Sequence, residues 1–121
     1  MKSLKFKVLG KDWKAKFLKD KAFIKKFNKE DSATTVFKEK TAYFNLSDFS
    51  TETIGHELFH VLLEEAGYYS VRLDQDRFEE LVCELFGKHG EELSGIKWKI
   101  YYHVVPVELP DLEPELFLEG T

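Results

Sequence analysis

The chain has 121 residues, of which 43% are hydrophobic and 33% charged, and a formal net charge of −4. This length suits one compact domain over residues 1–121, and this composition excludes general disorder. No apolar run approaches the ~20 residues that a membrane-spanning helix requires, and no secretory signal is recognisable at the N-terminus. The single cysteine, Cys83, excludes an intramolecular disulfide, so we expect a cytoplasmic protein that has no contact with a membrane.

Charge is divided unevenly along the chain. Residues 1–40 hold 13 lysines against five acidic residues, whereas residues 41–121 hold five basic residues against 17 acidic ones. A basic segment is compatible with nucleic acid or with an acidic partner. The lysines alternate with apolar residues, however, as they do on a strand with one face in the core and the other in water. We therefore expect a solvated strand surface in preference to a nucleic-acid partner.

The N-terminal part of the chain predicts a hairpin and a short helix. Residues 4–9 and 13–18 are two runs of period two joined at Gly10-Lys11, which is typical of a β-hairpin. Residues 19–27 place apolar side chains at helical spacing among lysines. This pattern predicts an amphipathic helix that ends near Asn28.

A second hairpin is predicted from residues 33–37 and 41–46, which are rich in Thr, Val, Tyr and Phe. The charged residues between them, Lys38-Glu39-Lys40, predict the turn. With a period of two, the second strand directs three apolar side chains inward: Ala42, Phe44 and Leu46.

The next segment predicts a largely buried helix. Ser47 or Ser50 is placed to cap its start, and Gly67 to end it after Ala66. At about 100° per residue, apolar side chains cover most of its circumference and leave one narrow polar stripe. The stripe consists of Thr53, Glu57, His60 and Glu64. A helix that is apolar on most sides is buried, so its polar stripe is the part open to chemistry; Glu64 and Glu65 are expected at the surface or rim.

A third helix should begin at Gln75 or Asp76 and run to about His89. Its core-facing stripe has the spacing i, i+3, i+4, i+7, i+8: Phe78, Leu81, Val82, Leu85 and Phe86. Residues 96–107 are rich in aromatic and β-branched side chains, which predicts an extended segment. Three prolines then interrupt an acidic C-terminal stretch: Pro106, Pro110 and Pro114. The core is therefore expected within about residues 4–95. Residues 96–121 are expected to form an extended C-terminal segment, to which the sequence assigns no role.

Residues 56–60 have the sequence His-Glu-Leu-Phe-His. Positions i and i+4 share one helix face, so His56 and His60 can present two imidazole nitrogens to one metal ion with Glu57 beside them. This HExxH spacing is typical of zinc hydrolases. The metal lowers the pKa of a bound water to about 7, and the carboxylate removes its proton and transfers it to the leaving group. We expect Zn²⁺ on His56 and His60 and Glu57 as general base, although the same donors could hold another first-row metal.

A hydrolytic zinc site takes three protein ligands and leaves a fourth position for water. No histidine follows His60 until His89, and the only methionine is Met1, so a third histidine followed by a Met-turn is missing. A carboxylate of the following helix is the natural third ligand. Glu79 lies nearer the apolar stripe, whereas Glu80 shares a face with Glu84, which favours Glu80.

The segment from Glu80, Glu-Leu-Val-Cys-Glu-Leu-Phe-Gly, resembles the second motif of thermolysin-like gluzincins, in which a glutamate ligand is followed four residues later by an acidic residue. The separation of 20 residues between His60 and Glu80 also resembles that class. This resemblance implies Glu80 as the third zinc ligand. It also implies that Glu84 accepts a hydrogen bond from His56 and so selects the tautomer of that imidazole.

The order of elements over residues 4–90 resembles the small phage- and mobile-element-associated metallopeptidases of the ImmA/IrrE type. That resemblance implies a minimal zincin-like α+β fold, in which a small antiparallel or mixed sheet packs against an active-site helix and a second, Glu-bearing helix. In zincins the strand before the active-site helix is an edge strand that pairs with an extended substrate. Three residues inherit this substrate-binding role: Thr41, Tyr43 and Asn45. The segment after residue 95 has no counterpart in the family.

We therefore expect a zinc-dependent metallopeptidase, a protease acting on an extended segment of a protein or peptide. The alternative is a catalytically inactive metal-binding regulatory or interaction module, whose site would be closed by a fourth protein ligand such as Cys83 or His89. The oligomeric state stays open, and so does the donor for the transition-state oxyanion. Its candidates are Tyr68, Tyr69, Tyr101, Tyr102 and His103.

Overall fold

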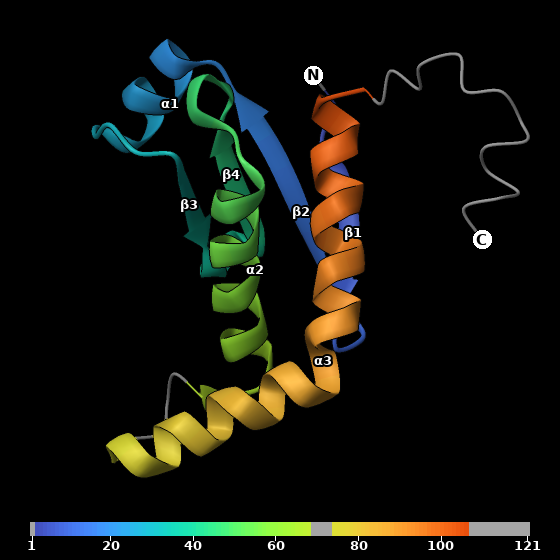
Figure 1. Ribbon diagram of the computed structural model, residues 1–121. Helices are drawn as coiled ribbons and strands as arrows, with labels where there is room; N and C mark the ends of the chain where they lie inside the picture. The colour runs from blue at the N-terminus through green and yellow to red at the C-terminus, as the bar shows by residue number, and fades with distance from the viewer. Residues whose placement is uncertain (1, 69–73, 107–121) are drawn as a thin grey trace, which may run out of the picture.

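The computed structural model describes residues 2–68 and 74–106 (Figure 1). Within these ranges the fold is α+β, as expected: a four-stranded mixed sheet packs against helices. The elements in chain order are β1 (Leu4–Val8), β2 (Lys11–Leu18), α1 (Asp20–Phe27), β3 (Ala33–Val36), η1 (Phe37–Glu39), β4 (Thr41–Asn45), η2 (Leu46–Asp48), α2 (Thr51–Glu65) and α3 (Gln75–Val104). No helix in the described ranges is long and apolar enough to cross a membrane.

The sheet has the strand order β1-β2-β4-β3. Strands β1 and β2 form the predicted antiparallel hairpin, with Leu4 opposite Ala15 and Val8 opposite Lys11. Gly10 occupies its turn with a φ of 76°, a conformation that glycine adopts without steric cost. The second predicted hairpin is also confirmed, since β3 and β4 pair antiparallel, and β4 runs parallel to β2.

The expectation that the strand before the HExxH helix is an edge strand is wrong. Strand β4 lies between β2 and β3, and all five of its residues are buried. The apolar side chains of β4 account for this position. Ala42 and Phe44 are 0% exposed, and their burial is most complete when the strand has a neighbour on both sides. In β3, by contrast, three of four residues are only half-buried. The edge beside α2 is therefore β3, and β1 forms the other edge.

Helix α2 has the predicted limits and lies along the sheet. Ser50, and not Ser47, is its N-cap, because the Ser50 hydroxyl accepts a hydrogen bond from the Thr53 N–H at 3.2 Å. After Ala66 the helix ends at Gly67, with a φ of 79°. The apolar side of α2 packs against the inner face of the sheet. Four of its side chains are at most 1% exposed: Ile54, Leu58, Val61 and Leu62. Leu63 is partly buried and packs against the same core.

Helix α3 is far longer than predicted. It spans 30 residues, so the prediction that it ends near His89 is wrong. Residues 96–107 were expected to be extended, but residues 96–104 are helical. Leu93 and Ile100 continue the helical spacing of Leu81 and Leu85, and all four are buried in the common core. Burial against the sheet therefore outweighs the β-propensity of the aromatic and branched residues around Leu93 and Ile100. The prediction that Phe78 and Phe86 also face the core is wrong, because they are 47% and 57% exposed. Residues 107–121 lie outside the described ranges.

The two halves of α3 have different surroundings. Figure 1 shows that its C-terminal half lies beside β1, whereas its N-terminal half bends away and passes beneath the C-terminal end of α2. Three glycines stand in the middle of the helix: Gly87, Gly90 and Gly95. Glycine weakens a helix interior, which accounts for a bend in this part of the chain.

Candidate metal centre

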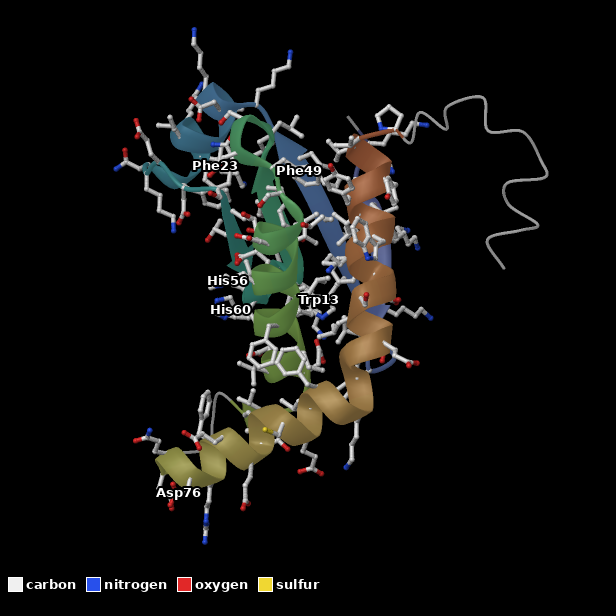
Figure 2. All side chains as sticks on the ribbon, viewed as in Figure 1. Trp13, Phe23, Phe49, His56, His60 and Asp76 are labelled. Carbon is white, nitrogen blue, oxygen red and sulfur yellow. The ribbon has the colours of Figure 1, made fainter. Side chains whose placement is uncertain are left out.

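His56, Glu57 and His60 lie in the middle of α2, on the side of the helix that faces strand β3. Because Ile54, Leu58 and Val61 are held in the core, the polar stripe lies to one side of the packed face, toward β3. Figure 2 shows both labelled histidines on the same side of α2. Local helix geometry and burial of the apolar side together orient the site.

The two imidazoles of this group lie close enough to share a metal ion. His56 Nε2 and His60 Nε2 are 3.1 Å apart, and the ring planes are inclined by 76°. Two nitrogens bound to one tetrahedral zinc ion would be about 3.3 Å apart, given Zn–N bonds of about 2.0–2.1 Å. Donor atoms of His56, Glu57 and His60 all lie within 4.8 Å of one another. The set therefore fits a divalent first-row metal.

The Glu57 carboxylate is hydrogen-bonded through one of its oxygens. Its side chain is 7% exposed, and its Oε1 accepts a hydrogen bond from the Thr35 hydroxyl of β3 at 3.1 Å. Its Oε2 lies 3.8 Å from His56 Nε2, too far for a hydrogen bond. One carboxylate oxygen is thus tied to the sheet, and the other faces the histidines.

A pocket of ≈ 570 Å³ opens between α2 and the strand β3. Its walls come from the loop before β3, from β3 and η1, and from the polar side of α2. The lining residues are Lys29, Asp31, Ser32, Ala33, Thr34, Thr35, Phe37, Glu52, Thr53, His56, Glu57 and His60. The HExxH residues therefore face a space large enough for part of a peptide chain.

The structure does not bring the predicted third ligand to the histidines. Glu79 and Glu80 are exposed on the N-terminal half of α3, and the potential metal-binding group within the described residues includes neither. Leu81 and Leu85 hold this half of α3, because they are 7% and 5% exposed in the common core. The assignment of Glu80, with Glu79 as its rival, stays a prediction.

Glu84 likewise lies apart from His56. Its carboxylate accepts a hydrogen bond from Lys88 Nζ at 2.7 Å, and this contact lowers the pKa of Glu84. The recorded neighbours of the His56 ring are His60 and Glu57. The role of Glu84 in orienting His56 therefore stays a prediction.

Thr41, Tyr43 and Asn45 lie in the internal strand β4 and do not line the pocket. The Thr41 hydroxyl donates to the Glu39 carbonyl at 3.0 Å, and the Asn45 amide donates to Asp20 Oδ1 at 2.9 Å. Burial and a hydrogen bond to the Glu39 carboxylate raise the pKa of Tyr43 to about 12. The hydrogen bonds of these side chains stabilise the fold. Their predicted substrate-binding role depended on an edge strand, and that edge is β3 and not β4.

The described side chains that could donate to an oxyanion or close the metal site lie away from the pocket. On α3, Tyr101 stacks on Phe49 with ring centroids 6.0 Å apart, and His103 Nε2 contacts the Lys2 carbonyl at 3.0 Å. Neither Cys83 nor His89 belongs to the group of potential metal ligands among the described residues. Tyr69 lies outside those residues. Tyr68, Tyr101, Tyr102 and His103 are absent from the lining of the pocket.

Comparison with known proteins gives no further evidence. No family model, curated protein or solved structure matches the chain. The close approach of His56, Glu57 and His60 at HExxH spacing is therefore the observation from which a function is argued.

Thr35 is the site residue that the sequence did not indicate. Residues 33–37 were expected to form a strand, but nothing in the sequence placed that strand beside the HExxH helix. The pairing of Thr35 with Ala42 shows that Thr35 shares the inner face of the sheet with a fully buried residue. Strand order was the missing information.

Proposed function

We propose that this protein is a zinc-dependent metallopeptidase, a hydrolase in which His56 and His60 hold the zinc and Glu57 is the general base. The observation that supports it is the joint geometry of the three residues. Two imidazole nitrogens lie 3.1 Å apart, and a buried carboxylate directs its free oxygen toward them inside a pocket. A bound zinc ion would supply Lewis acidity, which acidifies water and polarises a carbonyl.

Glu57 would carry the proton transfers of the reaction. Its Oε2 would accept a proton from the attacking water, and the same carboxyl group would then donate that proton to the amine of the cleaved bond. The position of the carboxylate supports this role, because a side chain that is 7% exposed loses few protons to bulk water between the two transfers. His56 and His60 would remain neutral so that their ring nitrogens can bind the metal.

A peptide is the substrate class that the pocket favours. Its wall includes Ala33, Thr34 and Thr35 of β3, a strand that pairs with β4 alone within residues 2–68 and 74–106. An unpaired strand edge presents backbone N–H and C=O groups to which an extended peptide can add as a further strand. We propose that the substrate pairs with β3, and not with the strand of Thr41, Tyr43 and Asn45 that the sequence led us to expect.

Glu80 remains our proposed third ligand, with Glu79 as the alternative. Because both are exposed on α3 and lie outside the group formed by His56, Glu57 and His60, this assignment requires the N-terminal half of α3 to approach the histidines when zinc binds. The glycines in the middle of α3 support such a movement, since they lower the cost of changing the helix bend. With His56, His60 and Glu80 as its zinc ligands, the enzyme would be a peptidase of the ImmA/IrrE type.

Zinc content and hydrolysis of the full chain test the proposal. The wild-type protein should bind one zinc ion and cleave an unfolded, fluorescein-labelled casein in a zinc-dependent way. Glu57→Gln should keep the zinc and lose about 10²–10⁴-fold in turnover, the usual contribution of general acid–base catalysis. Glu64→Gln, on the same stripe of α2, is the matched control. A Glu57→Gln protein with wild-type turnover would contradict the proposal.

One observation favours a second function, a metal-binding module without catalysis. In the described residues the third donor nearest to the histidines is Glu57 itself. If Glu57 binds the metal, it is no longer available as the general base. Glu57→Gln would then reduce zinc affinity strongly, whereas in a peptidase the affinity would change little.

A further inference from the structure

We infer that Thr35 is a positioning residue for Glu57, and that its hydroxyl fixes the orientation of the carboxylate so that one oxygen faces the metal centre. The inference rests on the proposed metallopeptidase function and adds to it a residue outside the HExxH motif. It follows from the position of Thr35 on β3, 22 residues before Glu57, with a hydrogen bond of 3.1 Å between the two side chains.

A general base needs a defined orientation. The terminal torsion of a glutamate side chain is broad, so the carboxylate rotates readily unless a neighbour fixes one oxygen. Among the described residues, the recorded hydrogen bond to the Glu57 carboxylate comes from Thr35. Because that bond holds Oε1, the second oxygen Oε2 is left on the side of His56, 3.8 Å from its Nε2.

Thr35 is itself rigidly held, which makes it suitable for this task. Its backbone is part of the β3–β4 ladder, where it pairs with Ala42. Its β-branched side chain has restricted rotation about χ1. The hydroxyl therefore has a nearly constant position relative to the sheet, and it fixes Glu57 relative to the edge on which we propose that substrate binds.

The geometry makes Thr35 act through Glu57 and not through the metal. Thr35 does not belong to the group of potential ligands, and its recorded side-chain hydrogen bond goes to Glu57. Removal of its hydroxyl should therefore reduce the rate of the chemical step and leave zinc affinity unchanged. Loss of a partner of this kind typically costs about 10–100-fold in activity.

The test compares Thr35→Val with Thr35→Ser in the zinc-loaded full chain. Valine keeps the shape and β-propensity of threonine without the hydroxyl, whereas serine keeps the hydroxyl. With labelled casein as substrate, Thr35→Val should lower kcat about 10–100-fold and leave KM and zinc affinity within about twofold. Thr35→Ser should restore most of the lost activity. Thr35→Ala is a second hydroxyl-free variant if Thr35→Val does not fold.

A double variant separates positioning from a general structural effect. If Thr35 acts only through the carboxylate, adding Thr35→Val to Glu57→Gln should cause no further loss of turnover. An additional loss of about tenfold or more in the double variant would overturn the inference, and so would equal activities of Thr35→Val and wild type. A wild-type protein that binds zinc and cleaves nothing would overturn the proposed function, and with it the role of Thr35.

Discussion

Glu65 tests how the helix that carries the HExxH residues is held against the sheet. Its carboxylate, in the last turn of α2, accepts hydrogen bonds from Trp13 Nε1 at 2.8 Å and from Lys40 Nζ at 2.9 Å. The Glu65 side chain is only 8% exposed, which fits the rim and not the open surface, and Trp13 is 1% exposed. One carboxylate thus joins α2 to β2 and to the turn before β4.

Glu65→Ala should lower the free energy of unfolding by about 2–3 kcal/mol. Most of this loss comes from Trp13, because a buried N–H without an acceptor costs about 1–3 kcal/mol. The Lys40 side chain is 48% exposed, so solvent screens its ion pair and its loss adds at most about 1 kcal/mol.

Urea unfolding of the zinc-free chain at pH 7 measures this quantity. Glu64→Ala, the adjacent position of the same helix, is the matched control and should change the unfolding free energy by no more than about 0.5 kcal/mol. A Glu65→Ala loss as small as that of the control would refute the view that this carboxylate anchors α2.

The same contact predicts a pH dependence of stability. Burial raises the pKa of Glu65, but hydrogen bonds from Lys40 and Trp13 outweigh it, so the pKa lies below the ordinary value of 4.5. A carboxyl group whose pKa is depressed by folding stabilises the protein above its unfolded pKa and loses this contribution as pH falls through the folded pKa. The difference in stability between wild type and Glu65→Ala should therefore shrink as pH falls below 4.5, and a difference that is the same at pH 7 and well below pH 4.5 would contradict this account.

Two further predictions concern α3. Glu80→Gln should weaken zinc binding roughly tenfold or more in competition with a chromophoric chelator, and Glu79→Gln should leave it unchanged; the reverse order would move the third ligand to Glu79. Ile100→Ala should cost about 2–5 kcal/mol of unfolding free energy, because Ile100 is 0% exposed in the core. Trp98→Ala, at a position that is 42% exposed, is its control, and equal small losses would show that residues 96–104 do not pack on the sheet.

Local patterns predicted the elements that carry the site. The cap at Ser50, the end at Gly67 and the apolar circumference between them defined α2, since helix capping and 3.6-residue periodicity depend on neighbours in sequence. Strand alternation likewise predicted both hairpins. The C-terminal half of α3 was missed because Trp98, Tyr101 and Tyr102 have high β-propensity, whereas Leu93 and Ile100 are buried only because the sheet lies against them.

By itself, the sequence determined which potential metal-binding groups lie together on one helix. The spacing of His56, Glu57 and His60 is sufficient to bring their donor atoms together on any helix, because positions four apart share a face. Only the tertiary structure decided what surrounds them: that β3 and not β4 forms the edge, that Thr35 holds Glu57, and that Glu80 lies on an exposed part of α3. Strand order and helix docking depend on contacts between residues far apart in the chain, where burial of apolar surface outweighs local propensity.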